Sequence, residues 1–207
     1  CKVFLKISFT IKQKQKQFNS ASFAGLYHRY TNQLMNVLEL FSRITTFVFD
    51  IDGVLTDGSL LVMPGGAMVR RMNIKDGYAL QLAVKAGYYV VIISGGNAPE
   101  VEDRLNKLGV THVFMRAENK KMILENFMQQ HSLKQSEVLF MGDDIPDYEV
   151  MSNVGLACCP ADAATEIKQI SKYISPLKGG EGCARDVIEK VLKLRGNWSL
   201  DTNIKAQ

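Results

Sequence analysis

The sequence predicts an α/β fold, namely a Rossmann-like doubly wound parallel sheet with a β-hairpin flap and no cap domain. Short, fully apolar runs alternate with helical patterns along the chain, which is typical of a parallel sheet covered by helices on both faces. Three of these runs are predicted to be buried strands: Thr46–Phe49, Tyr89–Ile93 and Val138–Met141. Each is followed at once by small and polar residues, and open α/β sheets bind their ligands at this edge.

The segments between these strands predict the remaining elements. Residues 59–73 show a strand pattern on both sides of Pro64-Gly65-Gly66, which predicts the hairpin flap. Further patterns predict helices over 77–86, 99–108 and 187–194, and a strand over His112–Met115. One helix and one strand already fill the interval from Ser94 to Lys120, so this interval has no room for a separate cap domain.

Composition indicates one globular domain, which we place at residues 35–197, followed by a flexible C-terminus over 198–207. The 207 residues are 46% hydrophobic, enough for a sizeable core. Residues 1–34 are interpreted as a disordered extension or a mis-assigned start, because Lys12–Gln17 is low in complexity and Met35 leads directly into the first strand.

Charge and cysteine usage narrow the partners and the compartment. Basic residues gather in the first 43 positions, and the remainder is mildly acidic, so no nucleic-acid partner is expected. No apolar run of about 18 residues is present, so no membrane partner is expected either. Cys158 and Cys159 are adjacent and poorly placed to pair, which favours a reducing compartment and a cytoplasmic location.

Two carboxylates stand two residues apart at the end of the first strand. Gly53 lets the backbone turn sharply after them, so Asp50 and Asp52 can face one small polar volume. This arrangement suits phosphoryl transfer through an aspartyl-phosphate, with Asp50 as the nucleophile and Asp52 as general acid and then base. Taken alone, an Asp-x-Asp pair is as often an ordinary acidic turn.

Later segments supply groups that such a reaction needs. Ser94 and the Gly95 amide follow the second strand and would cradle phosphate oxygens. Lys120 opens a predicted helix and could neutralise the transferring phosphoryl group, with Lys121 as the alternative. The third strand ends in acids that include Asp143, and carboxylates suit a hard cation with oxygen ligands.

These residues together resemble a known family. Asp50-x-Asp52, Ser94, Lys120 and Gly142-Asp143-Asp144 are similar, in this order, to the four motifs of the haloacid dehalogenase-like phosphatases, over about Ile44–Leu194. The resemblance implies a Mg²⁺ cofactor bound by the Asp50 carboxylate, the Asp52 backbone carbonyl and Asp143. Asp144 and Asp147 would order the metal waters or Lys120 from outside this ligand set.

A narrower resemblance concerns the substrate. The hairpin, the missing cap, Lys75-Asp76-Gly77 and the glycine-rich segment 178–186 resemble the 3-deoxy-D-manno-octulosonate 8-phosphate phosphatases. This implies hydrolysis of a keto-sugar acid phosphate in lipopolysaccharide precursor synthesis. It also implies a homotetramer with packed hairpins, and a glycine-rich tail that can reach a neighbouring site. Glu181 and Cys183 depart from the usual Arg and Ala of that segment.

Two alternatives stay open. A sister activity on 2-keto-3-deoxy-nononate 9-phosphate carries Glu at the place of Gly96 and a lysine matching Lys107, and this chain has only the second. A non-catalytic oligomerisation module would be expected to lose Asp50, Asp52 or Asp143, and all are present. On the hairpin, Arg70 and Arg71 alternate faces, so at most one points toward the site. The candidate substrate-contact residues are Lys75, Asp76, Arg104, Lys107 and Arg185.

Overall fold

The computed structural model describes residues 37–202, so the prediction for residues 1–34 lies outside the described residues. The chain divides into two units, Cys1–Glu39 and Leu40–Gln207, and every element named below belongs to the second. Within the described range, no helix is both long enough and apolar enough to cross a membrane.

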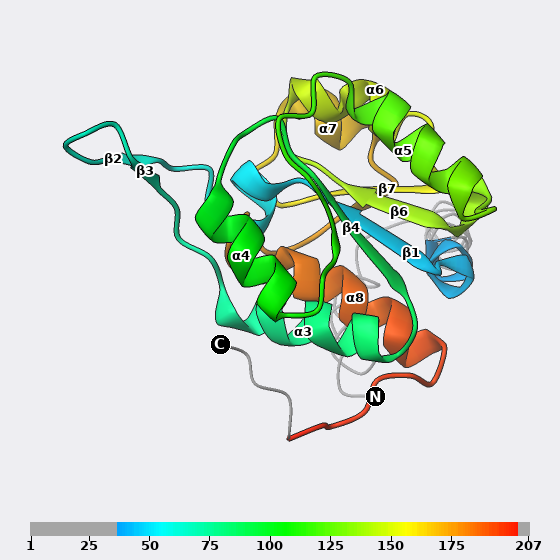
Figure 1. Cartoon of the computed structure of the whole chain (residues 1–207). Helices are drawn as coiled ribbons and strands as arrows, with labels where there is room; N and C mark the ends of the chain where they lie inside the picture. Colours follow the sequence, from blue (N-terminus) through cyan, green and yellow to red (C-terminus); the bar gives the residue numbers. More distant parts are fainter. Residues whose placement is uncertain (1–36, 203–207) are drawn as a thin grey trace, which may run out of the picture. The chain divides into compact units, whose positions relative to one another are not determined.

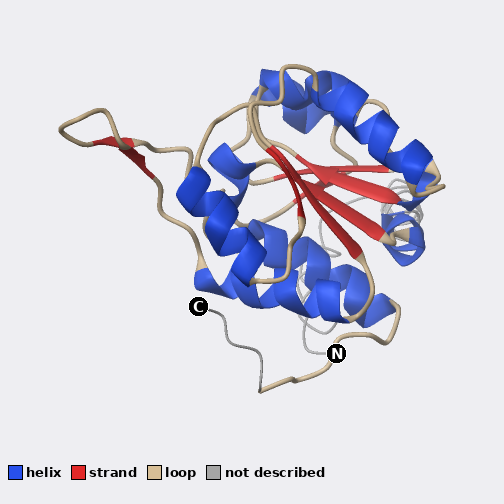
Figure 2. Ribbon diagram, viewed as in Figure 1, coloured by secondary structure: helices blue, strands red, loops and turns tan. Residues whose placement is uncertain are grey.

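Six parallel strands form the central sheet in the order β5-β4-β1-β6-β7-β8 (Figure 2). The chain moves outward from β1 to β4 and β5, then returns to β6 on the other side of β1. In open α/β sheets, ligands bind beyond the strands' carboxyl ends at such a reversal, which here lies at β1. The strands are β1 Thr46–Phe49, β4 Tyr89–Ile93, β5 His112–Phe114, β6 Val138–Met141, β7 Leu156–Cys159 and β8 Tyr173–Ile174.

Helices cover both faces of the sheet, with α3, α4 and α8 on one side and α5, α6 and α7 on the other (Figure 1). The doubly wound α/β prediction is therefore confirmed. The helices are α3 Ile74–Lys85, α4 Pro99–Lys107, α5 Lys120–Gln130, α6 Tyr148–Met151, α7 Thr165–Ile170 and α8 Cys183–Leu194, and the short turns are η1 Ile51–Leu55, η2 Gln135–Glu137 and η3 Ile145–Asp147.

The central strands form the core, because both of their faces are covered. Every residue of β1 and of β6 is buried, and Phe47, Phe49 and Phe140 are among the largest side chains with no contact with solvent. This explains why these strands read as continuous apolar runs instead of alternating patterns.

The predicted hairpin is present, and it stands away from the body of the domain (Figures 1 and 2). Strands β2 Leu61–Val62 and β3 Met68–Val69 pair with each other in an antiparallel sheet that is separate from the central one. A bridge between Thr56 and Met72 closes its base. The flap therefore begins and ends beside the loop that follows β1.

Two helices begin earlier than predicted. Helix α3 begins at Ile74 instead of residue 77, because the Asn73 side chain accepts the Lys75 N–H and caps the helix. Helix α8 begins at Cys183 instead of residue 187, directly after Gly182, whose φ is 105°. The sequence pattern placed residues 183–186 in the glycine-rich segment and assigned no element to residues 74–76.

The end of the chain also differs from the predictions. Segment 178–186 is not a separable tail, because it forms a tight turn and the first turn of the buried helix α8. Part of the predicted flexible C-terminus is packed: the Trp198 ring lies 6.2 Å from that of Tyr78, and Asp201 pairs with Lys85 at 3.3 Å. Apolar and ionic contacts with α3 therefore extend the ordered domain beyond residue 197.

Candidate active site

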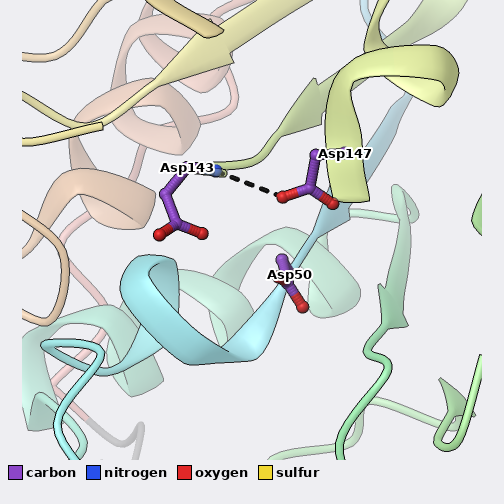
Figure 3. A group of neighbouring side chains, drawn as sticks. All are labelled: Asp50, Asp143 and Asp147. Atoms are coloured by element: carbon purple, nitrogen blue, oxygen red, sulfur yellow. Dashed lines mark hydrogen bonds between the residues drawn. The ribbon is translucent and has the colours of Figure 1, made fainter. Parts of the chain in front are cut away.

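The acids predicted to act together meet where β1 and β6 end. Asp50 follows β1 directly, and Asp143 and Asp147 follow β6 in the loop and in η3. Figure 3 shows the three side chains around one small volume. One oxygen from each carboxylate lies within 4.8 Å of the others. Parallel neighbouring strands bring these acids together although they lie about 90 residues apart in sequence.

Asp50 is held on both sides of its carboxylate. Its Oδ1 accepts the Ile51 N–H at 2.7 Å, and its Oδ2 lies 2.9 Å from Lys120 Nζ. Burial raises the pKa of Asp50, while the Lys120 charge and hydrogen bond oppose this shift. The Asp50 carboxylate is therefore fixed in one orientation at the floor of the site.

Lys120, and not Lys121, lies in this cluster. The Lys120 ammonium pairs with Asp50 and also with Asp147 Oδ1 at 2.7 Å, and its side chain is nearly buried. Burial alone would lower the pKa of Lys120, but the two carboxylates outweigh it and raise that pKa. Lys121 points to Glu149 at the surface instead, at 3.0 Å.

Asp143 and Asp147 are crowded by negative charge. Burial and the neighbouring carboxylates, Asp50 above all, raise the pKa of Asp143 to about 7 and that of Asp147 to about 6. Asp147 Oδ2 accepts the Asp143 N–H at 3.2 Å, the bond drawn in Figure 3. Asp144 is exposed, and its carbonyl accepts the Asp147 N–H.

This donor set fits a hard divalent cation. Three carboxylates converge, and Lys120 is the basic group that bonds to two of them, so negative charge remains uncompensated. Oxygen ligands of this kind are those that Mg²⁺ prefers. Asp147, expected outside the ligand set, has an oxygen within 4.8 Å of those of Asp50 and Asp143.

Two positions in contact with the clustered acids require glycine. Gly53 has a φ of 82°, and a Cβ there would lie 1.9 Å from Asp143 Oδ2. A Cβ at Gly142 would lie 2.4 Å from Asp147 Oδ2. Any side chain at either position would push apart the carboxylates that the fold brings together.

Asp52 lies apart from the three clustered acids and faces the hairpin. The Arg70 guanidinium holds it with two bonds, from Nε to Oδ1 at 2.7 Å and from Nη2 to Oδ2 at 3.0 Å. Arg71 points away and pairs with Asp57 at 2.8 Å. Strand alternation had predicted that at most one of the two arginines faces the site, but nothing in the sequence pattern favoured Arg70 over Arg71 or paired it with Asp52.

The loop predicted to cradle phosphate lies next to Asp52. Ser94 follows β4 and is buried, and its hydroxyl accepts the Gly96 N–H at 3.3 Å. Gly95 is exposed. A Cβ at Gly96 would lie 3.3 Å from Asp52 Oδ2 and 3.2 Å from Arg70 Nη2. The loop after β4 therefore adjoins the Asp52–Arg70 pair.

Two predicted substrate-contact residues have structural partners. Asp76 is buried, and its Oδ1 accepts the Arg185 N–H at 2.7 Å. Burial raises its pKa to about 6. The Arg185 guanidinium lies 5.4 Å from the Trp198 ring centre and bonds to Glu189. The Asp76–Arg185 bond joins α3 to α8, while the Arg185 side chain contacts α8 and the segment after it, so both residues have partners within the fold, and their contact with substrate stays a prediction.

The other three candidates lie on helix surfaces. Lys75 is exposed at the start of α3, and Arg104 is half-buried on α4. Lys107 is exposed and pairs with Asp103 one turn earlier on α4, at 2.5 Å. A contact of this kind is common on solvated helix faces.

The fold and the site together define a phosphoryl-transfer enzyme of the haloacid dehalogenase-like class. The model of the haloacid dehalogenase-like hydrolases matches residues 112–185. The 3-deoxy-D-manno-octulosonate 8-phosphate phosphatase KdsC of Escherichia coli is 32% identical over 85% of this chain and 92% of its own length.

Solved structures agree with this relationship. The octulosonate phosphatase from Yersinia pestis matches with a TM-score of 0.76 and 30% identity, over 78% of this chain and 87% of that one. The enzyme from Moraxella catarrhalis, solved with magnesium, phosphate and 3-deoxy-D-manno-octulosonate (KDO), matches with a TM-score of 0.76 and 26% identity, over 78% and 93%. The chain belongs to the KDO 8-phosphate phosphatase family of haloacid dehalogenase-like hydrolases, and it is a phosphatase.

Proposed function

We propose that this protein hydrolyses KDO 8-phosphate to KDO and phosphate, with Mg²⁺ as cofactor, in the synthesis of lipopolysaccharide precursors. The observation that carries the proposal is that two neighbouring acids have different partners at one site. Asp50 pairs with Lys120 in a buried cluster, and Asp52 beside it pairs with Arg70. The relatives named above, two of which match at 30% identity or more, carry this activity in their names.

The nucleophile in this proposal is Asp50. Its carboxylate oxygen attacks phosphorus, and the bond from phosphorus to the sugar oxygen breaks, which leaves an aspartyl-phosphate. Lys120, the Ser94 hydroxyl and the Gly95 N–H bind the equatorial oxygens as charge spreads over them. Bound Mg²⁺, held by Asp50, the Asp52 carbonyl and Asp143, would offset the repulsion between two anions.

Asp52 acts on the other side of the phosphoryl group. It donates a proton to the departing sugar oxygen, then takes one from the water that hydrolyses the aspartyl-phosphate. Its side chain is 34% exposed, against 11% for Asp50, which leaves it accessible to leaving group and water. The Arg70 fork limits the orientations of the Asp52 carboxylate.

The test is initial-rate phosphate release from the eight-carbon and nine-carbon keto-sugar acid phosphates side by side, with Mg²⁺ and with EDTA. We expect Mg²⁺-dependent turnover and a preference for the eight-carbon substrate. Preference for 2-keto-3-deoxy-nononate 9-phosphate would overturn the substrate assignment and make Lys107 the first residue to replace. No Mg²⁺-dependent release from either substrate would overturn the reaction itself.

The proposal includes a homotetramer built on the hairpins. An isolated two-stranded hairpin is marginally stable in water, and this one exposes apolar side chains that a second copy could cover. They are Leu60, Leu61, Val62, Met63, Met68 and Val69. Light scattering should give the mass of four chains, and Val62→Glu should reduce it. A monomeric wild-type protein would contradict this assembly.

A cytoplasmic location stays part of the proposal. Cys158, Cys159 and Cys183 are buried and free of disulfides. Burial raises the pKa of each thiol, which keeps it protonated and unreactive. These cysteines support the reducing compartment expected from the sequence.

A further inference from the structure

A glycine turn formed by residues 178–182 lies directly against the backbone of the loop that carries Asp52. A Cβ at Gly179 would lie 2.0 Å from the carbonyl oxygen of Gly53 and 2.9 Å from that of Thr56. The Gly180 N–H donates to the Val54 carbonyl at 2.9 Å. The backbone of the glycine turn therefore contacts the backbone of the loop after Asp52 directly, with no side chain between them.

Two side chains hold the glycine turn itself, and a third holds the helix that follows it. The Gly179 N–H donates to Asp162 Oδ1 at 3.0 Å, and the Gly180 carbonyl accepts from Asn73 Nδ2 at 3.2 Å. Asp76 then fixes the first turn of α8 by accepting the Arg185 N–H. Asp76 Oδ2 is buried and has no hydrogen-bond partner in the described structure. The burial of Asp76 is thus offset through one oxygen, which is directed at α8.

A third contact joins the start of α8 to the same loop. The Cys183 thiol donates to the Val54 carbonyl at 3.2 Å, so that carbonyl accepts two bonds, one from Gly180 within the glycine turn and one from the first residue of α8. On its other side the loop is held by Thr56, whose Oγ1 accepts the Gly53 N–H and donates to the Ile51 carbonyl. The backbone that follows Asp52 is thereby held on both sides.

From these contacts we propose that the glycine turn positions Asp52 and Gly53, and that Asp76 is a positioning residue that acts through the turn. This inference rests on the proposed function, because it assigns the turn a part in the same reaction. Gly53 directly follows Asp52 and packs against the Asp143 carboxylate. A shift of Gly53 therefore moves Asp52 relative to Arg70 and to the clustered acids. Misplacement by about 1 Å can cost a reaction about 100-fold.

Gly179→Ala tests this inference, with Gly155→Ala as its matched control. Neither glycine has a φ in the left-handed range, so alanine adds only a steric collision with main chain. At Gly155 the collision is with Gln135 O at 2.6 Å, ahead of β7 and at the opposite end of the sheet from the acids. Both variants should lose thermal stability, but only Gly179→Ala should lower kcat, by about 10- to 100-fold.

A second pair of variants tests Asp76. Asp76→Asn keeps an oxygen that can accept the Arg185 N–H, whereas Asp76→Ala removes it. We expect kcat to fall about tenfold in Asp76→Ala with KM little changed, and to be largely restored in Asp76→Asn. Equal loss of kcat in both variants would overturn the role given to the Asp76 oxygen.

Hydrogen–deuterium exchange supplies a readout that does not depend on activity. Peptides covering residues 50–57 should exchange faster in Gly179→Ala than in Gly155→Ala. If the two variants exchange alike and keep the same kcat, the inference is wrong. If the wild type releases no phosphate but exchange still differs as expected, the proposed function fails and the positioning role stands.

Discussion

Asp50 and Asp52 are separated by one residue, yet they lie in different surroundings. Asp50 lies in the sheet's core layer, where Lys120 of α5 and the Ile51 amide hold it. Asp52 lies at the boundary with the hairpin, where Arg70 holds it. The sequence predicted that both acids face one small volume, but only Asp50 joins the cluster, because the backbone is non-helical at Asp52 (φ −74°, ψ 122°) and at Gly53 (φ 82°).

This difference matches the two parts of the proposed reaction. A nucleophile benefits from a fixed orientation, and the core elements around Asp50 supply it. A general acid and base must exchange protons with a leaving group and with water, which requires partial exposure. The comparison teaches that core packing builds one half of the site and that a flap completes the other.

Replacing the nucleophile should have the largest effect. Asp50→Asn should lower kcat by about 10³-fold or more, because the amide cannot form the aspartyl-phosphate. Asp57→Asn, at the exposed end of the same loop, is the control and should retain most activity. Steady-state phosphate release and far-UV circular dichroism check both variants. Residual activity above a trace in folded Asp50→Asn would show that another group attacks phosphorus.

Two adjacent lysines test the buried part of the site, which contains Asp50. Lys120→Ala should lower kcat by about 100-fold, because it removes the charge that meets Asp50 and the phosphoryl oxygens. Lys121→Ala removes a surface pair with Glu149 and should change kcat less than about twofold. The same phosphate-release assay measures kcat for both variants. Equal effects of the two substitutions would contradict the assignment of Lys120.

Two adjacent arginines test the exposed part of the site, which contains Asp52. Arg70→Ala should lower kcat by about tenfold, because Asp52 loses the fork that orients it. Arg70→Lys should recover only part of this, since lysine offers no planar fork. Arg71→Ala is the control, and kcat and KM should be determined separately for all three. An unchanged kcat in Arg70→Ala would leave the hairpin without a role in orienting Asp52.

The smallest effect concerns stability and pH. The pKa of Asp143 is raised to about 7 in the fold, above its value of about 3.9 in an unfolded chain. The folded state therefore binds the extra proton, and this contribution to stability is present at low pH and lost as pH rises through about 7.

At pH 8 in EDTA, Asp143→Asn should accordingly raise the free energy of unfolding, by about 1–2 kcal/mol after allowance for solvent screening. At pH 4 the gain should vanish, and Mg²⁺ should stabilise the wild type more than the variant. Urea unfolding at both pH values measures this, with Asp103→Asn, at an exposed position on α4, as the control. A destabilised Asp143→Asn at pH 8 in EDTA would mean that the acids are not in electrostatic conflict.

The sequence by itself determined the fold class, the central strands and the candidate residues at their carboxyl ends, but not the strand order or the strands β7 and β8. The strands at Thr46–Phe49, Tyr89–Ile93 and Val138–Met141 were predicted to the residue. Their signals are local: an unbroken apolar run for burial on two faces, and acids or small residues directly after it. The hairpin was also predicted from a local signal, namely Pro64-Gly65-Gly66 between two strand patterns.

Tertiary structure alone decided which of several equivalent residues face the site. The rotation of α5 about its axis decides whether Lys120 or Lys121 faces the site. The orientation of the hairpin decides the same for Arg70 and Arg71. Neither orientation can be predicted from composition. Asp76 and Arg185 proved to join α3 to α8, a contact between residues 109 positions apart. Short-range patterns specify elements, whereas the partners of a charged side chain depend on how those elements pack.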